Sequence, residues 1–532
     1  MQEPSTDPPR DPSAVRWLWE LPFVGGILAG MVLLWLRGSL FVLDGSVAGY
    51  HWPEWLHNAW HVVHGRWDRM SGFRKPLHGY LVGMTGEVLG YDDAATFVAS
   101  ASALVMLLSA GVLARTLAGP AAGGLAAFCL GAVPLVANAA HWGNGYPLLA
   151  ASTGAALASA ALLAARPGRW TLLLATTATI AALASEDRGL LVAPWVAGMV
   201  VIAWRSPTRP SAFLFLGALV LTVAVPPAID AGLGHRAPFA LSADEKRVAQ
   251  KEVVHRWLQI EPDPDLVATC ASVRLEDTLE PHFFSTPCAR AVLHYNSTTI
   301  APRATFFSGT ALGLGILGWL FAVSRRQRTL GWTALATGGL AWVVFATATP
   351  MPHRYILQFA VPLVVIVPVA AGRIGRLAGN GWRGWALSTL LCFGTGWWGW
   401  NADPHDRRGP WQQSRGNWSA SDWADDARLV RAHVPADEAI LDCADHGINS
   451  AVLPDHVTGP APFLSPNAGF CTDWVEDPTR FGAARRWISV STTEGLFDSG
   501  KRTNIRLDIL VAETSGWRLV AERPGLQLWV RD

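Results

Sequence analysis

The feature that most constrains this chain is a run of 50 residues, 116–165, that contains no Asp, Glu, Lys or Arg. As one helix it would be about 75 Å long at 1.5 Å per residue, whereas the hydrocarbon core of a bilayer is about 30 Å thick. The run must therefore fold back on itself. The segment 141–147 (His-Trp-Gly-Asn-Gly-Tyr-Pro) has the Gly, Asn and Pro of a tight turn, which predicts two membrane helices joined by a hairpin.

The composition of the whole chain also predicts a membrane protein. Hydrophobic residues make up 51% of the 532 residues and charged residues only 16%, against about 25% charged in a typical soluble protein. The net charge of +1 provides no concentrated basic surface, which argues against a nucleic-acid partner. Eleven charge-poor stretches are candidate spans: 18–40, 94–114, 120–139, 145–165, 170–185, 189–204, 211–229, 304–323, 330–349, 355–372 and 384–400.

Arginines in the short connections predict how these spans are oriented, because positively charged loops stay in the cytoplasm. With a cytoplasmic N-terminus, every inner connection contains an arginine, beginning with Arg115 and Arg166. The short outer connections carry only Arg188 and Arg354. The sequence therefore predicts an all-α polytopic membrane domain of about eleven transmembrane helices.

The domain organisation follows from this topology. Residues 1–17 predict a disordered cytoplasmic tail, and 18–400 predict the membrane domain, with outer loops at 44–75 and 230–303. Residues 401–532 predict an extracytoplasmic α/β lobe. The bias toward Arg, Ala and Gly is typical of GC-rich bacterial genomes, so a bacterial inner (plasma) membrane is the expected location.

Short apolar runs and cysteines predict the details of the outer segments. The runs expected to be strands are 439–442, 487–491 and 509–512, with 517–521 and 526–530 as a closing hairpin. Four cysteines fall in segments assigned to the oxidising exterior: Cys270, Cys288, Cys443 and Cys471. Local pairing would give the disulfides Cys270–Cys288 and Cys443–Cys471, although sequence alone does not fix the connectivity.

Polar residues at the ends of the spans gather on the predicted outer face. They are Asp44 after the first span, Lys75 and His78 after the first outer loop, His141 in the second outer connection, Glu186, Asp187 and Arg188 in the third, and His353, Arg354 and Tyr355 in the fifth. Together such groups can hold a lipid phosphate, a divalent metal and a proton acceptor. Each also has a purely structural interpretation: a helix terminus for Asp44, a self-neutralising turn for 186–188, and an interfacial anchor for Arg354 and Tyr355.

The order of these pieces resembles the glycosyltransferase-C superfamily, in the branch of the protein mannosyltransferases and the lipid A aminoarabinose transferase. That branch has an acidic residue at the end of the first span, here Asp44, and then a large outer loop leading to a Lys-Pro-Pro-Leu-like element. Here the element reads Lys75-Pro76-Leu77-His78-Gly79-Tyr80. Its late Arg-Tyr-x-Leu element is similar to Arg354-Tyr355-Ile356-Leu357. The family's Asp-Glu pair reads Asp44-Gly45 in this chain.

The resemblance implies an inverting glycosyltransferase, a hexosyl or pentosyl transferase with a polyprenyl-phosphate-linked sugar as donor. The acceptor would be a hydroxyl of a lipid, glycan or protein at the outer face, among the membrane lipids. By analogy, Asp44 would be the general base, and Arg354 with Arg188 or Lys75 would bind the donor phosphate. The residues left to orient the acceptor would be His78, His141, Glu186, Asp187, His353 and Tyr355. A divalent metal is compatible with these residue types, and the resemblance does not decide whether one is used.

Two functions of other classes remain alternatives. A carrier or flippase for lipid-linked substrates would need ionisable residues along a path through the middle of the membrane, and the predicted spans contain almost none. A catalytically silent scaffold that binds glycans through its Trp-rich outer lobe is the third alternative.

Overall fold

A computed structural model of the chain describes residues 14–38, 40–41, 58–59, 62–63, 76–166, 168–185, 254–255, 264–322, 339–340, 342–348, 353–378, 382–401, 429–430, 432–435, 440–443, 486–492, 496–498, 503–524 and 526–531. It also describes the single residues Trp55, Gly65, Gly189, Val192, Lys251, Leu258 and Val475. The predicted tail before Ala14, the span 211–229 and almost all of the span 189–204 lie outside these residues.

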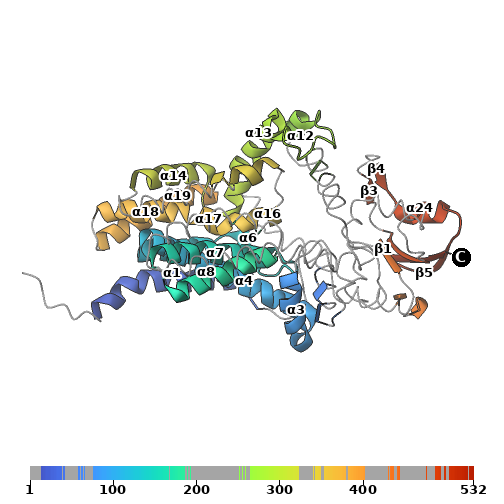
Figure 1. The fold of residues 1–532 in the computed structure, drawn as a ribbon, viewed down its shortest axis with the longest axis horizontal. Coiled ribbons are helices and arrows are strands. Elements are labelled where there is room, and N and C mark those ends of the chain that lie inside the picture. The colour runs from blue at the N-terminus through green and yellow to red at the C-terminus, as the bar shows by residue number, and fades with distance from the viewer. Residues whose placement is uncertain are drawn as a thin grey trace, which may run out of the picture.

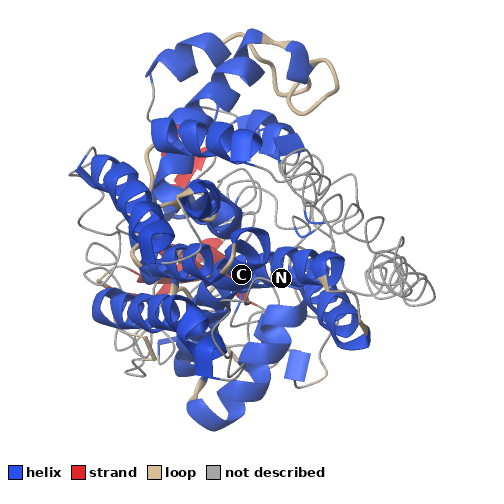
Figure 2. Cartoon of the chain, turned by 90° about the vertical axis from the view of Figure 1, so that its left-hand side faces the viewer, coloured by secondary structure: helices blue, strands red, loops and turns tan. Residues whose placement is uncertain are grey.

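Most of the described helices form one bundle (Figure 1). Their bounds are α1 (Ala14–Gly38), α3 (Pro76–Leu89), α4 (Tyr91–Ala118), α5 (Pro120–Gly131), α6 (Pro134–Ala139), α7 (Tyr146–Ala165), α8 (Arg169–Ser185), α14 (Gly309–Ala322), α16 (His353–Ile356), η7 (Leu357–Phe359), α17 (Ala360–Val364), α18 (Ile366–Leu377) and α19 (Trp382–Asn401). Helix α4 packs against α5 and α7, α1 packs on α5, α8 packs on α7, and both α14 and α19 pack on α18. In the view from the end of the bundle, the strands lie behind the helices (Figure 2).

Three segments in the described part of the chain are long and apolar enough to cross a membrane: Asp93–Ala118, Tyr146–Ala165 and Leu357–Leu377. A fourth span results if Pro287–Ala304 and Gly309–Trp319, which meet at 90°, are counted as one broken span. The protein is therefore a membrane protein, and the total of about eleven spans stays a prediction.

Helix breaks occur where the sequence predicted continuous spans. The predicted span 120–139 is divided between α5 and α6, because Pro134 has no N–H and its ring disfavours continuation of the preceding turn. The predicted span 355–372 begins earlier, at α16, and passes through the 3-10 turn η7 before α17 and α18. The hairpin predicted at 141–147 is confirmed, since α6 ends at Ala139 and α7 begins at Tyr146.

The segment before α14 is held by a disulfide. Helices α12 (Pro264–Cys270) and α13 (Pro287–Tyr295) are joined by the predicted bond Cys270–Cys288. The chain then passes through a π-helical turn, η4 (Asn296–Ile300), and a 3-10 turn, η5 (Ala301–Ala304). The buried amide of Asn296 donates a hydrogen bond to the carbonyl of Ala346 at 2.8 Å, which ties this turn to the helical residues 342–348. Cys471 lies outside the described residues, so the pair Cys443–Cys471 remains a prediction.

The C-terminal strands form a mixed four-stranded sheet in the order β1-β2-β6-β5. Its strands are β1 (Ile440–Cys443), β2 (Trp487–Ser491), β5 (Trp517–Arg523) and β6 (Leu526–Arg531), and a separate pair consists of β3 (Leu496–Asp498) and β4 (Thr503–Ile505). Strands β1 and β2 are parallel, whereas β5 and β6 are antiparallel, as expected for the predicted hairpin. Both faces of the sheet are covered: one core contains Ile488 and Val490, and a second contains Leu528 and Val530.

The strand predicted at 509–512 is wrong, because these residues belong to helix α24 (Leu507–Glu513). Leu507 and Val511, four residues apart, are both buried against the core that contains Ile488. This spacing places them on one face of a helix. The short apolar run was too brief to show its period in the sequence.

Candidate functional site

Four aromatic side chains from separate segments form a continuous row at the end of the bundle where α3, α6 and α16 lie (Figure 1). The Trp55 ring meets the His78 ring edge-on, with 5.0 Å between centroids, and the Tyr146 ring at 6.2 Å. Tyr146 in turn meets Tyr355 at 5.6 Å. Edge-to-face contacts of this kind are favourable beyond the area they bury. This aromatic row links the predicted first outer loop, α3, the start of α7 and α16.

Glycines allow these segments to approach each other. A Cβ at Gly145 would lie 2.5 Å from a carbon of the Trp55 ring, so the absence of a side chain there makes room for the indole. On α3, a Cβ at Gly83 would lie 2.6 Å from the carbonyl oxygen of Ala59. The first outer loop therefore packs directly on the backbone of α3 and of the hairpin before α7.

The segment that leads to Asp44 is tied to the hairpin that contains His141. The backbone N–H of Phe41 donates to the hydroxyl of Ser100 on α4 at 3.1 Å, and this hydroxyl donates to the carbonyl of Ala140 at 3.0 Å. Phe41 has a left-handed backbone (φ 58°), a conformation that is uncommon for a bulky residue. The chain thus turns sharply three residues before Asp44, beside the residue that precedes His141.

Helix α7 connects two further parts of the predicted site. The hydroxyls of Ser152 on α7 and Ser185 at the end of α8 lie 3.3 Å apart, next to the predicted third outer turn. One residue further along α7, the hydroxyl of Thr153 accepts a hydrogen bond from the amide of Gln358 at 3.4 Å. Because Gln358 follows Arg354 by four residues, this contact fixes η7 and the end of α16 against α7.

The structure describes three of the predicted site side chains. His78 and His141 are almost fully buried, Tyr355 is half-buried, and two of these, His78 and Tyr355, belong to the aromatic row. The backbones of His353 and Arg354 form the first turn of α16. The side chains of His353 and Arg354 lie outside the described part of the structure. The remaining predicted residues lie wholly outside it: Asp44, Lys75, Glu186, Asp187 and Arg188.

Arg303 is a candidate residue that the sequence reasoning missed. It lies in η5, which contacts α16, α6 and η7, and its side chain is half-buried. In the sequence Arg303 stands at the boundary of the long outer loop, where nothing distinguishes it from other loop arginines. The tertiary structure identifies it, because the chain bends by 90° after η5 and η5 contacts α16.

This end of the bundle combines packed aromatic rings with titratable groups. Burial raises the pKa of Tyr80, two residues after His78, so its phenol keeps its proton to a higher pH than an exposed tyrosine does. Among the residues that the structure describes, no group of three or more His, Cys, Asp or Glu side chains is arranged to hold a metal ion. Trp55, His78 and Tyr146 are almost fully buried, so the aromatic row fixes the segments against one another, and Tyr355 is its half-buried member.

No protein-family profile and no curated protein sequence matches the chain, but solved structures match its fold. The apo oligosaccharyltransferase of Archaeoglobus fulgidus has a TM-score of 0.54 at 12% identity, covering 97% of this chain and 75% of the other. ArnT from Cupriavidus metallidurans, bound to undecaprenyl phosphate, has a TM-score of 0.51 at 14% identity, covering 97% and 98%. The Archaeoglobus oligosaccharyltransferase AglB in complex with an inhibitory peptide and a dolichol-phosphate has a TM-score of 0.50 at 13% identity, covering 90% and 70%.

Identities this low establish the fold and leave the activity to be argued from the site. The match to ArnT extends over nearly the full length of both chains, so it includes the membrane helices and the C-terminal strands together. This protein has the glycosyltransferase-C fold, as the order of its sequence motifs predicted.

Proposed function

We propose that this protein is an integral membrane glycosyltransferase that moves a sugar from a polyprenyl-phosphate donor to an acceptor hydroxyl at the outer face of the membrane. The observation that carries the proposal is the aromatic row. It joins, at one end of the bundle, the segments that the sequence predicted to face outward. Each predicted catalytic or phosphate-binding residue is close in sequence to a residue that lies at this end of the bundle or is hydrogen-bonded to an element there.

The covalent chain limits how far these residues can be from the row. Asp44 follows Phe41 by three residues, a reach of about 11 Å at most, and Lys75 directly precedes α3. Arg188 follows Ser185 by three residues, and Arg354 is bonded to Tyr355 of the row. A cation–carboxylate site can therefore form here without a large rearrangement of the described helices.

The class of donor is supported by the ligands of the structural neighbours. ArnT was solved with undecaprenyl phosphate and AglB with a dolichol-phosphate, both of which are polyprenyl phosphates. Such a donor cannot leave the membrane, so its sugar must be used at the membrane surface. A site at the end of the helix bundle meets this requirement.

In the proposed reaction, the Asp44 carboxylate accepts the proton of the acceptor hydroxyl. The hydroxyl oxygen forms a bond to the anomeric carbon while the bond from that carbon to the phosphate oxygen breaks. The polyprenyl phosphate leaves with the bonding electrons, and Arg354, Arg188, Lys75 and the newly assigned Arg303 neutralise its charge. A single displacement inverts the anomeric configuration.

The other predicted residues would position the substrates. His78, His141, His353 and Tyr355 can donate or accept hydrogen bonds to sugar hydroxyls, and Glu186 and Asp187 can accept them. The two carboxylates together with an imidazole also suit a divalent cation, should the reaction use one. The sugar on the lipid is a hexose or a pentose, and both fit the same displacement.

The proposal also includes the wider topology. We propose about eleven spans in 18–400, a cytoplasmic N-terminal tail and an extracytoplasmic α/β lobe at 401–532, in a bacterial inner membrane. In this proposal the described sheet of β1, β2, β6 and β5 belongs to that lobe.

The test is transfer by the purified full-length protein, with a panel of polyprenyl-phosphate sugars and lipid, glycan and peptide acceptors. Asp44→Asn preserves shape but removes the proton acceptor, so we expect the rate to fall by roughly 10²–10⁴-fold. The matched control is Asp265→Asn, an exposed carboxylate on α12, which should transfer at the wild-type rate. Wild-type transfer by a correctly inserted Asp44→Asn protein would refute the catalytic assignment. Translocation of the lipid-linked sugar without transfer would instead identify a carrier, and glycan binding without either would identify a scaffold.

A further inference from the structure

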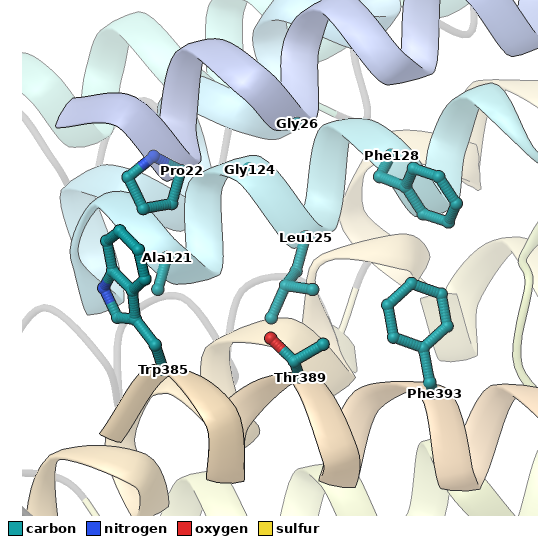
Figure 3. Close-up of a pocket in the computed structure, with 9 residues that line it drawn as sticks. All are labelled: Pro22, Gly26, Ala121, Gly124, Leu125, Phe128, Trp385, Thr389 and Phe393. Carbon is teal, nitrogen blue, oxygen red and sulfur yellow. The ribbon is translucent and has the colours of Figure 1, made fainter. Parts of the chain in front are cut away.

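An apolar groove lies between α1, α5 and α19 (Figure 3). It involves the first half of α1, which begins at the end of the bundle opposite α3 and α16 and therefore opposite the aromatic row (Figure 1). Its volume is about 210 Å³. Trp385, Thr389 and Phe393 of α19 form one wall and face Leu125 and Phe128 of α5 across it (Figure 3). The remaining lining residues are Pro22, Gly26, Ala121 and Gly124.

The groove borders the exposed surface of the bundle, because Phe393, which lines it, is 37% exposed. Leu390, next to Thr389 on α19, is 71% exposed, and Leu21, next to Pro22 on α1, is 54% exposed. Leucines exposed to this extent on a helix inside a membrane domain contact lipid. The natural occupant of a groove between them is therefore a hydrocarbon chain.

Positive charge collects at one end of the groove. The Arg376 guanidinium lies 3.3 Å from the position that a Cβ would take at Gly119, two residues before Ala121 in the groove floor. Arg383 precedes Trp385 by two residues and lies over the Trp382 ring. Among the described residues, no carboxylate lies within ion-pair distance of Arg376 or Arg383.

Two other arginines at this end, Arg115 and Arg373, are already engaged. Arg115 forms an ion pair with Glu20 at 2.6 Å, and Arg373 donates to the carbonyl of Leu117 at 2.6 Å. Arg376 and Arg383 thus supply two positive charges that the described part of the protein does not neutralise. An anionic group at the membrane surface would complement them.

The depth of the groove distinguishes a lipid chain from a helix. Trp385 and Phe393 are eight residues apart on α19, which is about 12 Å along the helix axis. One leaflet of hydrocarbon is about 15 Å deep, half of the bilayer core. Phe128 and Phe393, with ring centroids 5.3 Å apart, lie at the far end of the groove from Trp385 (Figure 3). A partner helix would need a contact surface through both leaflets.

We propose that this groove binds one acyl chain of an anionic membrane phospholipid, with its phosphate at Arg376 and Arg383. The site is separate from the proposed donor site, because it lies at the other end of the helices. It would fix α1 and α19 to each other through the lipid.

The experiment is native mass spectrometry of the purified full-length protein, titrated in detergent with phosphatidylglycerol or with phosphatidylcholine. We expect the wild type to retain phosphatidylglycerol in preference to phosphatidylcholine. A basic residue near a membrane surface contributes about 1 kcal/mol toward an anionic lipid, which is about fivefold in affinity. Arg376→Gln with Arg383→Gln should therefore weaken binding about thirtyfold. The matched control is Arg166→Gln with Arg169→Gln, at the same end of the bundle but on the α7–α8 connection, which should leave the affinity unchanged.

A second pair of variants tests the groove itself. Thr389→Phe fills it and should abolish the retained lipid, whereas Leu390→Phe, on the neighbouring lipid-facing position, should not. If Thr389→Phe fails to insert, Thr389→Leu gives the same test with a smaller side chain. The proposal would be overturned if the Thr389 and Leu390 variants retained the lipid equally. It would also be overturned if the two double arginine variants bound phosphatidylglycerol with equal affinity. A wild-type dimer that Thr389→Phe converts to a monomer would overturn it as well, because the groove would then be a helix-docking site.

Discussion

Ser100 joins the segment that leads to Asp44 to the hairpin before α7. Its hydroxyl accepts a hydrogen bond from the N–H of Phe41 and donates one to the carbonyl of Ala140. Ser100→Ala leaves the part-buried N–H of Phe41 and the buried carbonyl of Ala140 to be satisfied elsewhere, so we expect a loss of about 1–3 kcal/mol in the free energy of unfolding. The rate of sugar transfer should fall further than stability explains, because the Asp44 segment loses its anchor.

The comparison is with Ser159→Ala on α7. Ser159 is as well buried as Ser100, but its hydroxyl bonds only to carbonyls of its own helix, those of Ala155 and Ala156. This variant should lose less than about 1 kcal/mol and keep its transfer rate. Thermal unfolding in detergent and the transfer assay measure both effects. Similar transfer rates in the two variants would show that Ser100 does not position the site.

Gly145 sets how closely Trp55 approaches the start of α7. Its φ of −76° is accessible to any residue, so a substitution tests space rather than backbone strain. In Gly145→Ala the new methyl would meet the Trp55 ring at 2.5 Å and force the indole to shift. We expect a loss of about 1–3 kcal/mol in the free energy of unfolding and a weaker affinity for the donor.

The control for this change is Gly313→Ala on α14, where a Cβ would meet nothing within 4 Å. Alanine there should be neutral or slightly stabilising, because it favours the helix. Thermal unfolding separates the two variants. An unchanged unfolding midpoint in Gly145→Ala would mean that the Trp55 ring is not confined by the hairpin.

Individual site residues were predictable from the sequence to different degrees. His78, His141 and Tyr355 stand out as polar or aromatic residues at the ends of apolar spans, and the structure places all three at one end of the bundle. Trp55 and Tyr146 give no comparable signal in the sequence, because aromatic residues near span ends are common as interfacial anchors. Arg303 required the bend after η5, which local sequence does not encode.

At the scale of elements, helices α1 and α5 pack very closely, and small residues on both helices make this possible. A Cβ at Gly26 would lie 2.2 Å from the carbonyl oxygen of Gly124, and a Cβ at Gly131 would lie 2.4 Å from that of Gly30. Backbones approach this closely in membranes only where both partners have small residues.

Gly26→Val should therefore separate α1 from α5, with a loss of about 3 kcal/mol or a failure to accumulate in the membrane. Gly25→Val is an adjacent control with the same change in volume and β-branching, since a Cβ at Gly25 meets nothing within 4 Å. Expression level and thermal unfolding compare them. Equal stability of the two variants would contradict the packing described.

The elements themselves were predictable where they were long. The charge-free run 116–165 predicted two helices and a hairpin, and the structure has both, with the first helix further divided at Pro134. Short apolar runs predicted secondary structure less well, as α24 shows. This helix has seven residues, and its buried face, Leu507 and Val511, is set by the sheet on which it packs. Period is a reliable signal only over several turns.

At the scale of the molecule, the helix connections sort into two groups at opposite ends of the bundle. One end has the aromatic row, with Phe41 tied through Ser100 to Ala140. The other has the ion pair of Glu20 with Arg115 and the hydrogen bond of Arg373 to Leu117. This division follows the alternation of inner and outer turns that arginine placement predicted, although the sequence alone could not show that the outer turns converge on one row.

The side of the membrane on which the aromatic row lies is a property of the whole fold. The Cys270–Cys288 disulfide belongs to the segment that ends in η5, and η5 contacts α16. Disulfides persist in oxidising compartments. We therefore expect the aromatic row and residues 401–532 to lie outside the cytoplasm, and the Glu20–Arg115 end inside. Alkaline phosphatase, which is active only outside, should be active when fused after Asp532 and inactive when fused at Gly168, between α7 and α8. The opposite pattern would invert the topology and place the aromatic row in the cytoplasm, where a disulfide would not persist and an outer-face donor could not be reached.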